Sequence, residues 1–509
     1  MDRDNQESVL KCVEECSTSH KACSRPKATR LPTRVIDCSE PEFPRLVTSP
    51  SSSPPSHYAA LSYVWGENQP HRTTAENIDK YHHLIASEVV PKTIQDAIFT
   101  THSLSIRYLW VDSLCIIQDS EDDKDREIEK IRIYFQNAYI TIVAANAKRV
   151  SDGFLYNPPP WRSEPVQVPY PIPEEPGKVD VVFLYRTYAP WPTYDSPVDN
   201  RAWCLEERVL SPRRLVFCSH ALQYECQESR VNVNGSPLGL PDLYLRLPKP
   251  QAKKEDTSSI SEVTPEVTLA VVEDIWDFVV TQYTSRRLTK VKDKLVAFGA
   301  VAEQFQGLWP DTLSTRYIAG LWSHQLPASL LWQLSGEQHP LPEVTYRAPS
   351  WSWAAIEGTV ETIIFHPQQN VVISCEVKSW EVTLKRETNL YGQVTAGRLV
   401  IVANVMRGLA WDPAIRQADN LSRTTQGQPM AKNEAFGRVT ADSSEYMNRR
   451  MRNVPVVVAA ISEGVHSVFG LALVNIAKAG AYQYRRIGLV RIKNGSWVPE
   501  ALREEIVVV

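Results

Sequence analysis

The residue types best suited to chemistry gather in three short stretches of the 509-residue chain. Together they offer two carboxylates, two hydroxyls, a thiol, a guanidinium, two indole rings and a turn-forming glycine: Ser62, Trp65, Gly66, Asp112, Ser113, Cys115, Trp203, Glu207 and Arg208. Paired carboxylates can do general acid–base work, and a thiol or hydroxyl can act as a nucleophile when a base lies beside it. Indole rings can stack on flat ligands. These nine residues are the candidate site.

Asp112 is the candidate that most needs an explanation. It interrupts residues 106–118, IRYLWVDSLCIIQ, an apolar stretch that predicts a central strand covered on both faces. A carboxylate inside such a strand is costly unless it is paired, hydrogen-bonded or at the wet end of the strand. Two explanations stay open. Either Asp112 pairs with Arg208 inside the fold, or it faces a cleft together with Glu207.

Alternating strands and helices are expected to position these residues. Residues 58–66 and 139–145 read as buried strands, and a helix is predicted from Pro91. Residues 121–138 carry apolar side chains at helical spacing behind an acidic start, and residues 199–212 predict a further helix. This order predicts an α/β domain with a mostly parallel sheet and flanking helices. Ligands of such sheets bind at the carboxyl ends of the strands, where the candidate residues would lie.

The rest of the chain changes character twice. A polar stretch broken by Pro, Gly and Ser predicts a linker, helices follow it, and later segments alternate like antiparallel strands. Residues 410–452 are predicted to be a long loop. We expect an N-terminal Cys/His helix with a linker, an α/β domain, a second linker, a helical connector with Trp-rich motifs and a β-rich C-terminal domain. Their predicted bounds are 1–56, 57–230, 231–265, 266–358 and 359–509.

Composition excludes several classes of protein. The chain is 43% hydrophobic and 22% charged with a net charge of -4, which is typical of a globular protein and gives no support to nucleic acid as a partner. No apolar run approaches the roughly 18 residues of a membrane span. The first residues do not resemble a secretory signal, and nine cysteines scattered over the chain favour reduced thiols. We therefore expect a cytoplasmic protein.

Two further groups of residues allow a functional and a structural interpretation. The spacing of four residues places them on one helical face: Cys12, Cys16, His20 and Cys23. Four ligands from one straight helix cannot converge on a single ion, so we expect these side chains to pack in the fold and to bind no metal. Four tryptophans could line a groove, but we expect them to seal the joint between the helices and the β-rich domain: Trp322, Trp332, Trp351 and Trp353. Arg347 could reach a carboxylate of the first domain.

Five sequence blocks resemble fungal heterokaryon-incompatibility (HET) domains. They are YAALSYVWG, VPKTIQDAI, YLWVDSLCIIQDS, NAYITIVAA and RAWCLEERVLSPR, in the order in which that family carries them, over about Tyr58 to Cys226. Three positions depart from the family pattern. The family's Asp-Trp is Asp123-Lys124 here, its Tyr before the Asn-Ala pair is Phe135, and a Gln is Glu206. These departures leave the predicted fold unchanged and affect partner contacts.

The resemblance implies an intracellular effector of fungal heterokaryon incompatibility, with a role in non-self recognition and regulated cell death. The chain has neither a Walker-type phosphate loop nor repeats, so we expect no cofactor and no sensor module of its own. Its partner would be a protein of incompatibility signalling or a small nucleotide-like ligand.

The alternative function is an enzyme that uses an Asp112/Glu207 cleft. A nucleosidase-like enzyme would act on a dinucleotide, with Trp65 stacked on the base and Glu207 activating water or polarising the ribose. A condensing enzyme of fungal secondary metabolism would use Cys115 or Ser62 as its nucleophile. That second chemistry needs a neighbouring base, and none of the five blocks contains a histidine.

Overall fold

The chain forms two compact units in the computed structural model, Met1–Asn200 with Leu210–Arg246 and Arg201–Val209 with Leu247–Val509. The structure describes residues 3–50, 52–69, 71–155, 166–171, 178–184, 196–219, 221–234, 269–342, 346–363, 371–412, 420–425, 428–429, 437–446, 454–464, 467–476, 482–493 and 501–509. Most of the predicted linker at 231–265 lies outside these residues, so the five-part division stays a prediction.

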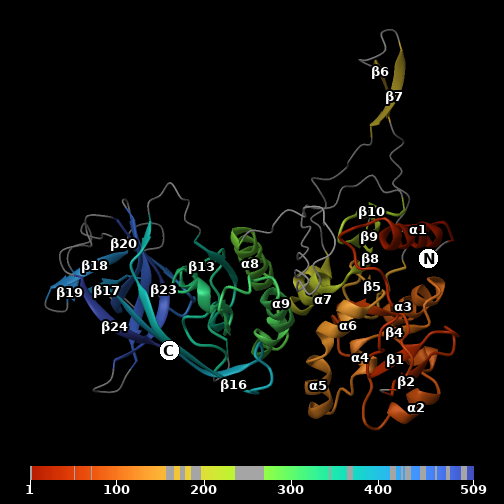
Figure 1. Ribbon diagram of the computed structural model, residues 1–509, viewed down its shortest axis with the longest axis horizontal. Coiled ribbons are helices and arrows are strands. Elements are labelled where there is room, and N and C mark those ends of the chain that lie inside the picture. The colour runs from red at the N-terminus through yellow and green to blue at the C-terminus, as the bar shows by residue number, and fades with distance from the viewer. Residues whose placement is uncertain are drawn as a thin grey trace. The chain divides into compact units, whose positions relative to one another are not determined.

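An eight-stranded mixed sheet forms the centre of the first unit (Figure 1). Its order is β10-β9-β8-β5-β3-β4-β1-β2. The strands are β1 (Arg34–Asp37), β2 (Arg45–Thr48), β3 (Tyr58–Ser62), β4 (Tyr108–Trp110), β5 (Ile140–Val143), β8 (Arg213–Phe217), β9 (Leu222–Cys226) and β10 (Arg230–Asn232).

The prediction of a mostly parallel sheet is correct for the centre of this sheet and wrong for its edges. The four central strands β8, β5, β3 and β4 run parallel to one another. The outer strands β1, β2, β9 and β10 are antiparallel. Short connections such as the one from β8 to β9 can only form hairpins, because a parallel crossover needs about a dozen residues or more.

The helices of the first unit begin and end largely where local chemistry predicts. They are α1 (Arg3–Thr18), α2 (Ile78–His83), α3 (Lys92–Ser103), α4 (Asp112–Cys115), α5 (Glu121–Ile128) and α6 (Ile131–Asn137), with the 3-10 turns η1 (Ser87–Val89) and η2 (Pro197–Asn200) and the hairpin β6 (Val166–Pro171) and β7 (Val179–Leu184). Helix α3 follows Pro91, and the Ser120 side chain caps α5 by accepting a hydrogen bond from the Asp123 amide. The single helix predicted over 121–138 is wrong, because the chain breaks between α5 and α6 while the apolar spacing continues across the break.

The strand predicted over residues 106–118 is shorter than expected. Strand β4 ends at Trp110, and Asp112 is the first residue of the one-turn helix α4. Leu114 and Cys115, which follow in that turn, are buried. A buried helical turn and a buried strand have the same apolar composition, so the pattern alone could not separate them.

Helices and aromatic rings occupy the first part of the second unit. Its elements are α7 (Ala202–Leu210), α8 (Leu269–Thr284), α9 (Val296–Gln306), the 3-10 turns η3 (Val291–Asp293), η4 (Ser323–Gln325), η5 (Ala328–Leu330) and η6 (Trp353–Ala355), and the strands β11 (Tyr317–Ile318), β12 (Leu321–Trp322), β13 (Trp332–Ser335) and β14 (Thr359–Thr362). Trp322 packs edge-on against Trp276 of α8, and Trp353 against Phe298 of α9. All four tryptophans of the predicted seal are at most 1% exposed, which supports the packing interpretation.

Antiparallel strands form the remainder of the second unit (Figure 1). They are β15 (Val372–Ile373), β16 (Glu376–Leu384), β17 (Val394–Trp411), β18 (Leu421–Thr425), β19 (Gln428–Pro429), β20 (Gly437–Ala441), β21 (Val454–Glu463), β22 (Ser467–Asn475), β23 (Gln483–Lys493) and β24 (Leu502–Val508). The pairings of β17, β21, β22, β23 and β24 close into a ring, in which only β23 and β24 pair in parallel. The long loop predicted at 410–452 is wrong where β18 and β20 form, because the buried side chains of Leu421 and Val439 join the core of this ring.

Candidate functional site

The carboxylate of Asp112 is held by the segment that follows β3. The Tyr63 hydroxyl donates to Asp112 Oδ1 over 2.9 Å, and the Trp65 indole Nε1 donates to Oδ2 over 3.0 Å. The backbone amide of Ser113 donates to Oδ1 over 2.6 Å. Each donor favours the ionised carboxylate, so Asp112 is a hydrogen-bonded group that links two loops.

Buried polar groups support this contact. The Tyr63 hydroxyl also lies 2.9 Å from the Ser113 hydroxyl and accepts a 3.4 Å hydrogen bond from the Gln69 amide. Burial, and then the negative charge of Asp112, raise the pKa of Tyr63 well above its ordinary value. The phenol therefore stays protonated and remains a donor to Asp112. Asp112 itself is partly exposed.

The Asp112 group lies where an α/β sheet commonly offers a binding site. Strands β4 and β5 flank β3 on opposite sides, so the direction of strand addition reverses at β3. Ligands bind outside the carboxyl ends of the strands at such a switch point. Ser62 is the buried last residue of β3 and pairs with Val143 in the sheet, whereas Trp65 is partly exposed beyond it.

Gly66 lies in the loop that follows β3, directly after Trp65. Its φ is +66°, and a Cβ atom at this position would approach the Lys148 carbonyl oxygen to 2.1 Å. The neighbouring Trp65 carbonyl accepts a 3.0 Å hydrogen bond from the Val150 amide. Only glycine fits this close approach, which fixes the loop that carries the indole.

Cys115 does not have the environment of a nucleophile. Its side chain is fully buried, and its sulfur accepts a 3.4 Å hydrogen bond from the Val111 amide. Burial raises the pKa of the thiol to about 12. Among the described residues no basic side chain lies within hydrogen-bonding distance of this sulfur. The thiol is a packing group of α4.

The third group of candidates belongs to the other compact unit. Trp203, Glu207 and Arg208 are partly exposed residues of α7, and residues 201–209 belong to the second unit, whereas Asp112 belongs to the first. The predicted cleft of Asp112 with Glu207 and Arg208 therefore stays a prediction.

An ion pair that sequence reasoning missed supports the turn after β4. Arg34 of β1 and Asp123 of α5 form a salt bridge with both side chains less than 10% exposed. Arg34 Nε also donates to the Cys115 carbonyl over 2.6 Å, and Asp123 Oδ2 accepts from the Ile117 amide over 2.8 Å. Asp123 matches the Asp of the family's Asp-Trp pair, which was a signal for a role at this position, but nothing in the sequence pointed to Arg34 as its partner. Tyr63 was missed too, although it lies within a block.

The cysteines and histidine near the N-terminus are not arranged as predicted. Helix α1 ends at Thr18, so His20 and Cys23 lie beyond it rather than on its face. These two residues and Cys16 meet Cys226 at the end of β9, and the four ligand atoms lie within 4.8 Å of one another. The remaining residue of the predicted set, Cys12, is half-buried on the helix.

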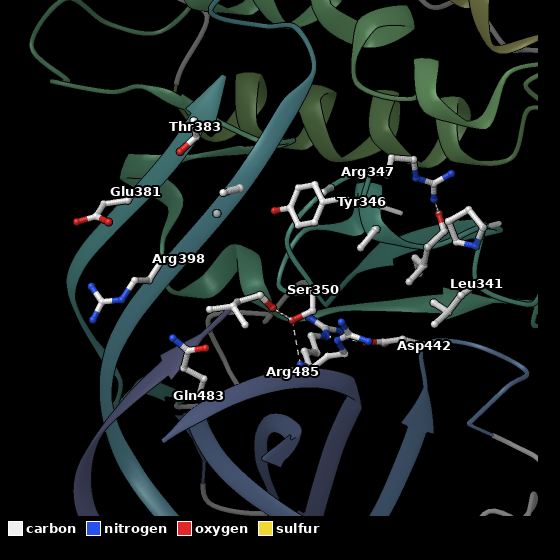
Figure 2. Close-up of a pocket in the computed structure, with 18 of the residues that line it drawn as sticks. Leu341, Tyr346, Arg347, Ser350, Glu381, Thr383, Arg398, Asp442, Gln483 and Arg485 are labelled. Carbon is white, nitrogen blue, oxygen red and sulfur yellow. Dashed lines mark hydrogen bonds and ion pairs between the residues drawn. The ribbon is translucent and has the colours of Figure 1, made fainter. Parts of the chain in front are cut away.

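A separate pocket of about 470 Å³ lies within the second unit (Figure 2). Glu381 of β16 and Arg398 of β17 are cross-strand neighbours at one side of it, and Gln483 and Arg485 come from β23. Its volume is typical of small-molecule sites, and its arginines would favour an anionic group.

Arg347 also lines this pocket and is held inside the second unit. Its guanidinium pairs with Glu357 and donates to the Ala354 carbonyl over 2.7 Å. Its Nη2 donates to the Ile356 carbonyl, also over 2.7 Å. These contacts lie within residues 347–357, and none of them involves a carboxylate of the first unit, which the sequence left open as a possible partner.

The first unit is thus an α/β domain with a mixed sheet, and a hydrogen-bonded carboxylate lies at the carboxyl ends of its central parallel strands. Residues 58–207 match the family model described as Heterokaryon incompatibility protein (HET). The chain carries a HET domain, as the sequence blocks predicted. The match begins at the first residue of β3 and ends in α7.

A curated relative supports the same family. The chain is 30% identical over 114 residues to heterokaryon incompatibility protein 6, OR allele, of Neurospora crassa. The aligned part is 19% of this chain and 15% of the relative, so most of both proteins lies outside the similarity. No solved structure matches the chain. Among the described residues, no helix is long and apolar enough to cross a membrane.

Proposed function

We propose that this chain is an effector of fungal heterokaryon incompatibility. In this proposal it acts in the cytoplasm, and its HET domain triggers regulated cell death after non-self recognition. The observation that carries the proposal is the family match over residues 58–207, which contains the complete Tyr63–Trp65–Asp112 contact. The similarity to a relative named as a heterokaryon incompatibility protein adds support.

Asp112 serves this function as a positioning residue. Its two oxygens accept hydrogen bonds from the loop after β3, while its backbone begins the turn after β4. Losing the carboxylate leaves the Tyr63 and Trp65 donors without their acceptor and releases the two loops from each other. The surface at the carboxyl ends of the strands, which we propose meets the protein partner, would then lose its shape.

Induced expression in a filamentous fungus tests the proposal. The full chain, produced in Neurospora crassa, is expected to slow colony extension strongly relative to an empty vector. Asp112→Ala is expected to restore growth at an equal level of folded protein. Asp122→Ala is the matched control, because Asp122 is an exposed carboxylate of the nearby helix α5, and it should arrest growth as the wild type does. Normal growth of colonies that express the wild-type chain would contradict the proposal.

An enzymatic function is the second candidate, and the partial exposure of Asp112 and Trp65 at the switch point favours it. Here the chain would cleave a dinucleotide, with the Trp65 ring against the base and Glu207 as the catalytic carboxylate. Buried Cys115, with its raised pKa, argues against the condensing alternative.

Purified chain incubated with a nicotinamide dinucleotide tests the dinucleotide reaction by chromatography. Release of the base is expected from the wild type and not from Glu207→Ala. Growth arrest that persists in both Asp112→Ala and Glu207→Ala, in folded protein, would exclude the catalytic version.

A further inference from the structure

We propose that Cys16, His20, Cys23 and Cys226 bind one Zn²⁺ ion that fastens the N-terminal segment to the sheet of the first unit. The four residues come from two places in the chain that are about two hundred positions apart. The ligand atoms of all four lie within 4.8 Å of one another. Three thiols and one imidazole form a donor set typical of structural zinc sites.

The distances within the group fit tetrahedral zinc. His20 Nδ1 lies 3.6 Å from Cys23 Sγ and 3.3 Å from Cys226 Sγ. Zinc bonds of about 2.3 Å to sulfur and about 2.0–2.1 Å to nitrogen place a tetrahedral N···S edge at about 3.6 Å. A Zn²⁺ ion therefore fits between these atoms with small side-chain movements.

The local structure presents the ligands in a way that a single helix could not. Helix α1 ends at Thr18, so only Cys16 is on the helix, and the following turn brings His20 and Cys23 back beside it. That turn is held by the Ala22 amide, which donates to Glu228 Oε2 over 2.7 Å. The fourth ligand, Cys226, is the last residue of β9, against which α1 lies (Figure 1).

Groups around the sulfurs suit thiolates. The Ser229 amide donates to Cys226 Sγ over 3.3 Å, the kind of hydrogen bond that orients a metal ligand from outside. Cys16, Cys23 and Cys226 are each less than 10% exposed. Burial of this kind shields a metal centre from water and from competing ligands.

A buried cation beside the group supplies an independent argument for a negative charge there. Arg213 is 2% exposed and is the cross-strand partner of Cys226. In the described part of the chain, Arg213 donates to the carbonyl oxygens of Ser24 and Tyr139, and no carboxylate pairs with it. A buried guanidinium without a counter-ion is costly. Zn²⁺ with three thiolates and a neutral imidazole carries a net charge of -1, which balances Arg213.

The metal would stabilise the fold by linking the N-terminal segment to strand β9. His20 and Cys226 are 206 positions apart, so the ion closes a long loop and holds α1 on β9. The four ligands are distinct from the Asp112 group, and all of them belong to the first unit. Loss of the ion is therefore expected to destabilise the first unit whether or not the chain is an effector.

Metal analysis of the purified full chain tests the site. Protein prepared with a reductant and without chelators is expected to contain one zinc per chain. Cys226→Ser and Cys23→Ser should each retain less than about a tenth of that zinc. Cys12→Ser is the matched control, because Cys12 lies on the same helix but outside the four-residue group, and it should keep its zinc.

A second measurement uses the wild-type chain and therefore does not depend on whether the variants fold. X-ray absorption at the zinc edge of the wild type is expected to give three sulfur ligands at about 2.3 Å and one nitrogen at about 2.0–2.1 Å. Co²⁺ in place of zinc should give the visible absorption bands of a tetrahedral thiolate site. A folded wild-type chain without metal, with free thiols or a disulfide among the three cysteines, would overturn the proposal. So would bound iron in place of zinc, an oxygen-rich zinc shell, or full zinc retention in Cys226→Ser.

Discussion

Asp112 shows how a single charged residue organises the loops of the HET domain. The sequence indicated that a carboxylate in this apolar stretch must either be held by a partner or face a site, and three donors hold it in the structure. The donors themselves, Tyr63 and Trp65, could not be predicted from spacing, because a hydrogen bond between residues 47 or 49 positions apart depends on how β3 and β4 align in the sheet. The proposed partner Arg208 belongs to the other compact unit, so its pairing with Asp112 stays a prediction.

Removing the Tyr63 hydroxyl should weaken the first unit. Tyr63→Phe deletes the donor to a charged acceptor, a hydrogen bond of a kind worth roughly 1.5–3 kcal/mol, and water can replace it in part because Asp112 is partly exposed. We expect a loss of about 1–2 kcal/mol in the free energy of unfolding, measured by urea denaturation. Tyr108→Phe removes a hydroxyl from β4 without deleting this contact and should change stability by less than about 0.5 kcal/mol. Equal effects of the two variants would contradict the account.

Cys115 should resist alkylation in the native chain. With a pKa of about 12, only about one thiol in ten thousand is ionised at pH 8, and the side chain is fully buried. Mass spectrometry after iodoacetamide treatment is expected to find Cys115 unmodified at neutral pH in native protein and modified after denaturation. Rapid native modification would show an accessible thiolate and would revive the condensing-enzyme alternative.

At the scale of elements, the sequence predicted which segments are regular better than it predicted where they end. The apolar spacing across residues 121–138 is continuous, yet the chain forms two helices there. The apolar run at 106–118 contains both a strand and a helical turn, since burial on all sides removes the periodicity that separates the two. The edge strands β1 and β2 pair with each other locally, but they join the sheet only where β1 pairs with β4, which is distant in sequence.

Asp37 links these edge strands and should make the first unit sensitive to acid. Burial raises the pKa of this carboxyl, but hydrogen bonds from Arg107 and Ser39 and the charge of Arg107 outweigh burial and lower the pKa from 3.8 to about 2. The folded pKa lies below the unfolded value, so the stabilisation is present above about pH 4 and is lost as the pH falls towards 2. Because Arg107 is half-exposed, we expect a contribution of about 1–2 kcal/mol at neutral pH.

The difference between wild type and Asp37→Asn measures this contribution. The variant should unfold more easily at pH 7, and the gap between the two chains should close between about pH 4 and pH 2. Glu40→Gln, at an exposed position near the end of β1, serves as the control and should show no such gap. A gap that is independent of pH would mean that Asp37 contributes through packing rather than charge.

At the scale of the whole molecule, composition and pattern predicted an α/β part and a β-rich part, and both are present. The sequence could not predict how the β-rich strands close into a ring, because β17 pairs with β21 and β24, which are distant from it in the chain. Nor could it predict the group of Cys16, His20, Cys23 and Cys226, since the fourth residue comes from β9 and only the fold brings it to the N-terminal turn. Helical spacing placed Cys12, Cys16, His20 and Cys23 on one helical face and predicted packing without a metal.

The second unit depends on a buried ion pair that the sequence does not reveal. Arg486 Nε donates to Asp442 Oδ2 over 2.9 Å, both side chains are at most 2% exposed, and the guanidinium lies 3.4 Å from the ring centre of Trp332. Asp442→Ala leaves this buried cation without its counter-ion, so we expect a loss of about 3–5 kcal/mol in the free energy of unfolding. Tryptophan fluorescence during denaturation would measure it.

A carboxylate of the same pocket provides the control for Asp442. Glu381→Ala removes an exposed carboxylate and should change the free energy of unfolding by less than about 0.5 kcal/mol. If Asp442→Ala were as mild as Glu381→Ala, the ion pair would not stabilise the second unit.

The effector function is tested most directly by cell viability after induction. Neurospora crassa hyphae that express the full chain are stained with a dye that enters only dead compartments, and the stained fraction is compared with that of an empty vector at a verified level of folded protein. We predict that the stained fraction rises well above background in hyphae with the wild-type chain and stays at background with Asp112→Ala. A background level of staining with abundant, folded wild-type chain would contradict the proposal that this HET domain triggers cell death.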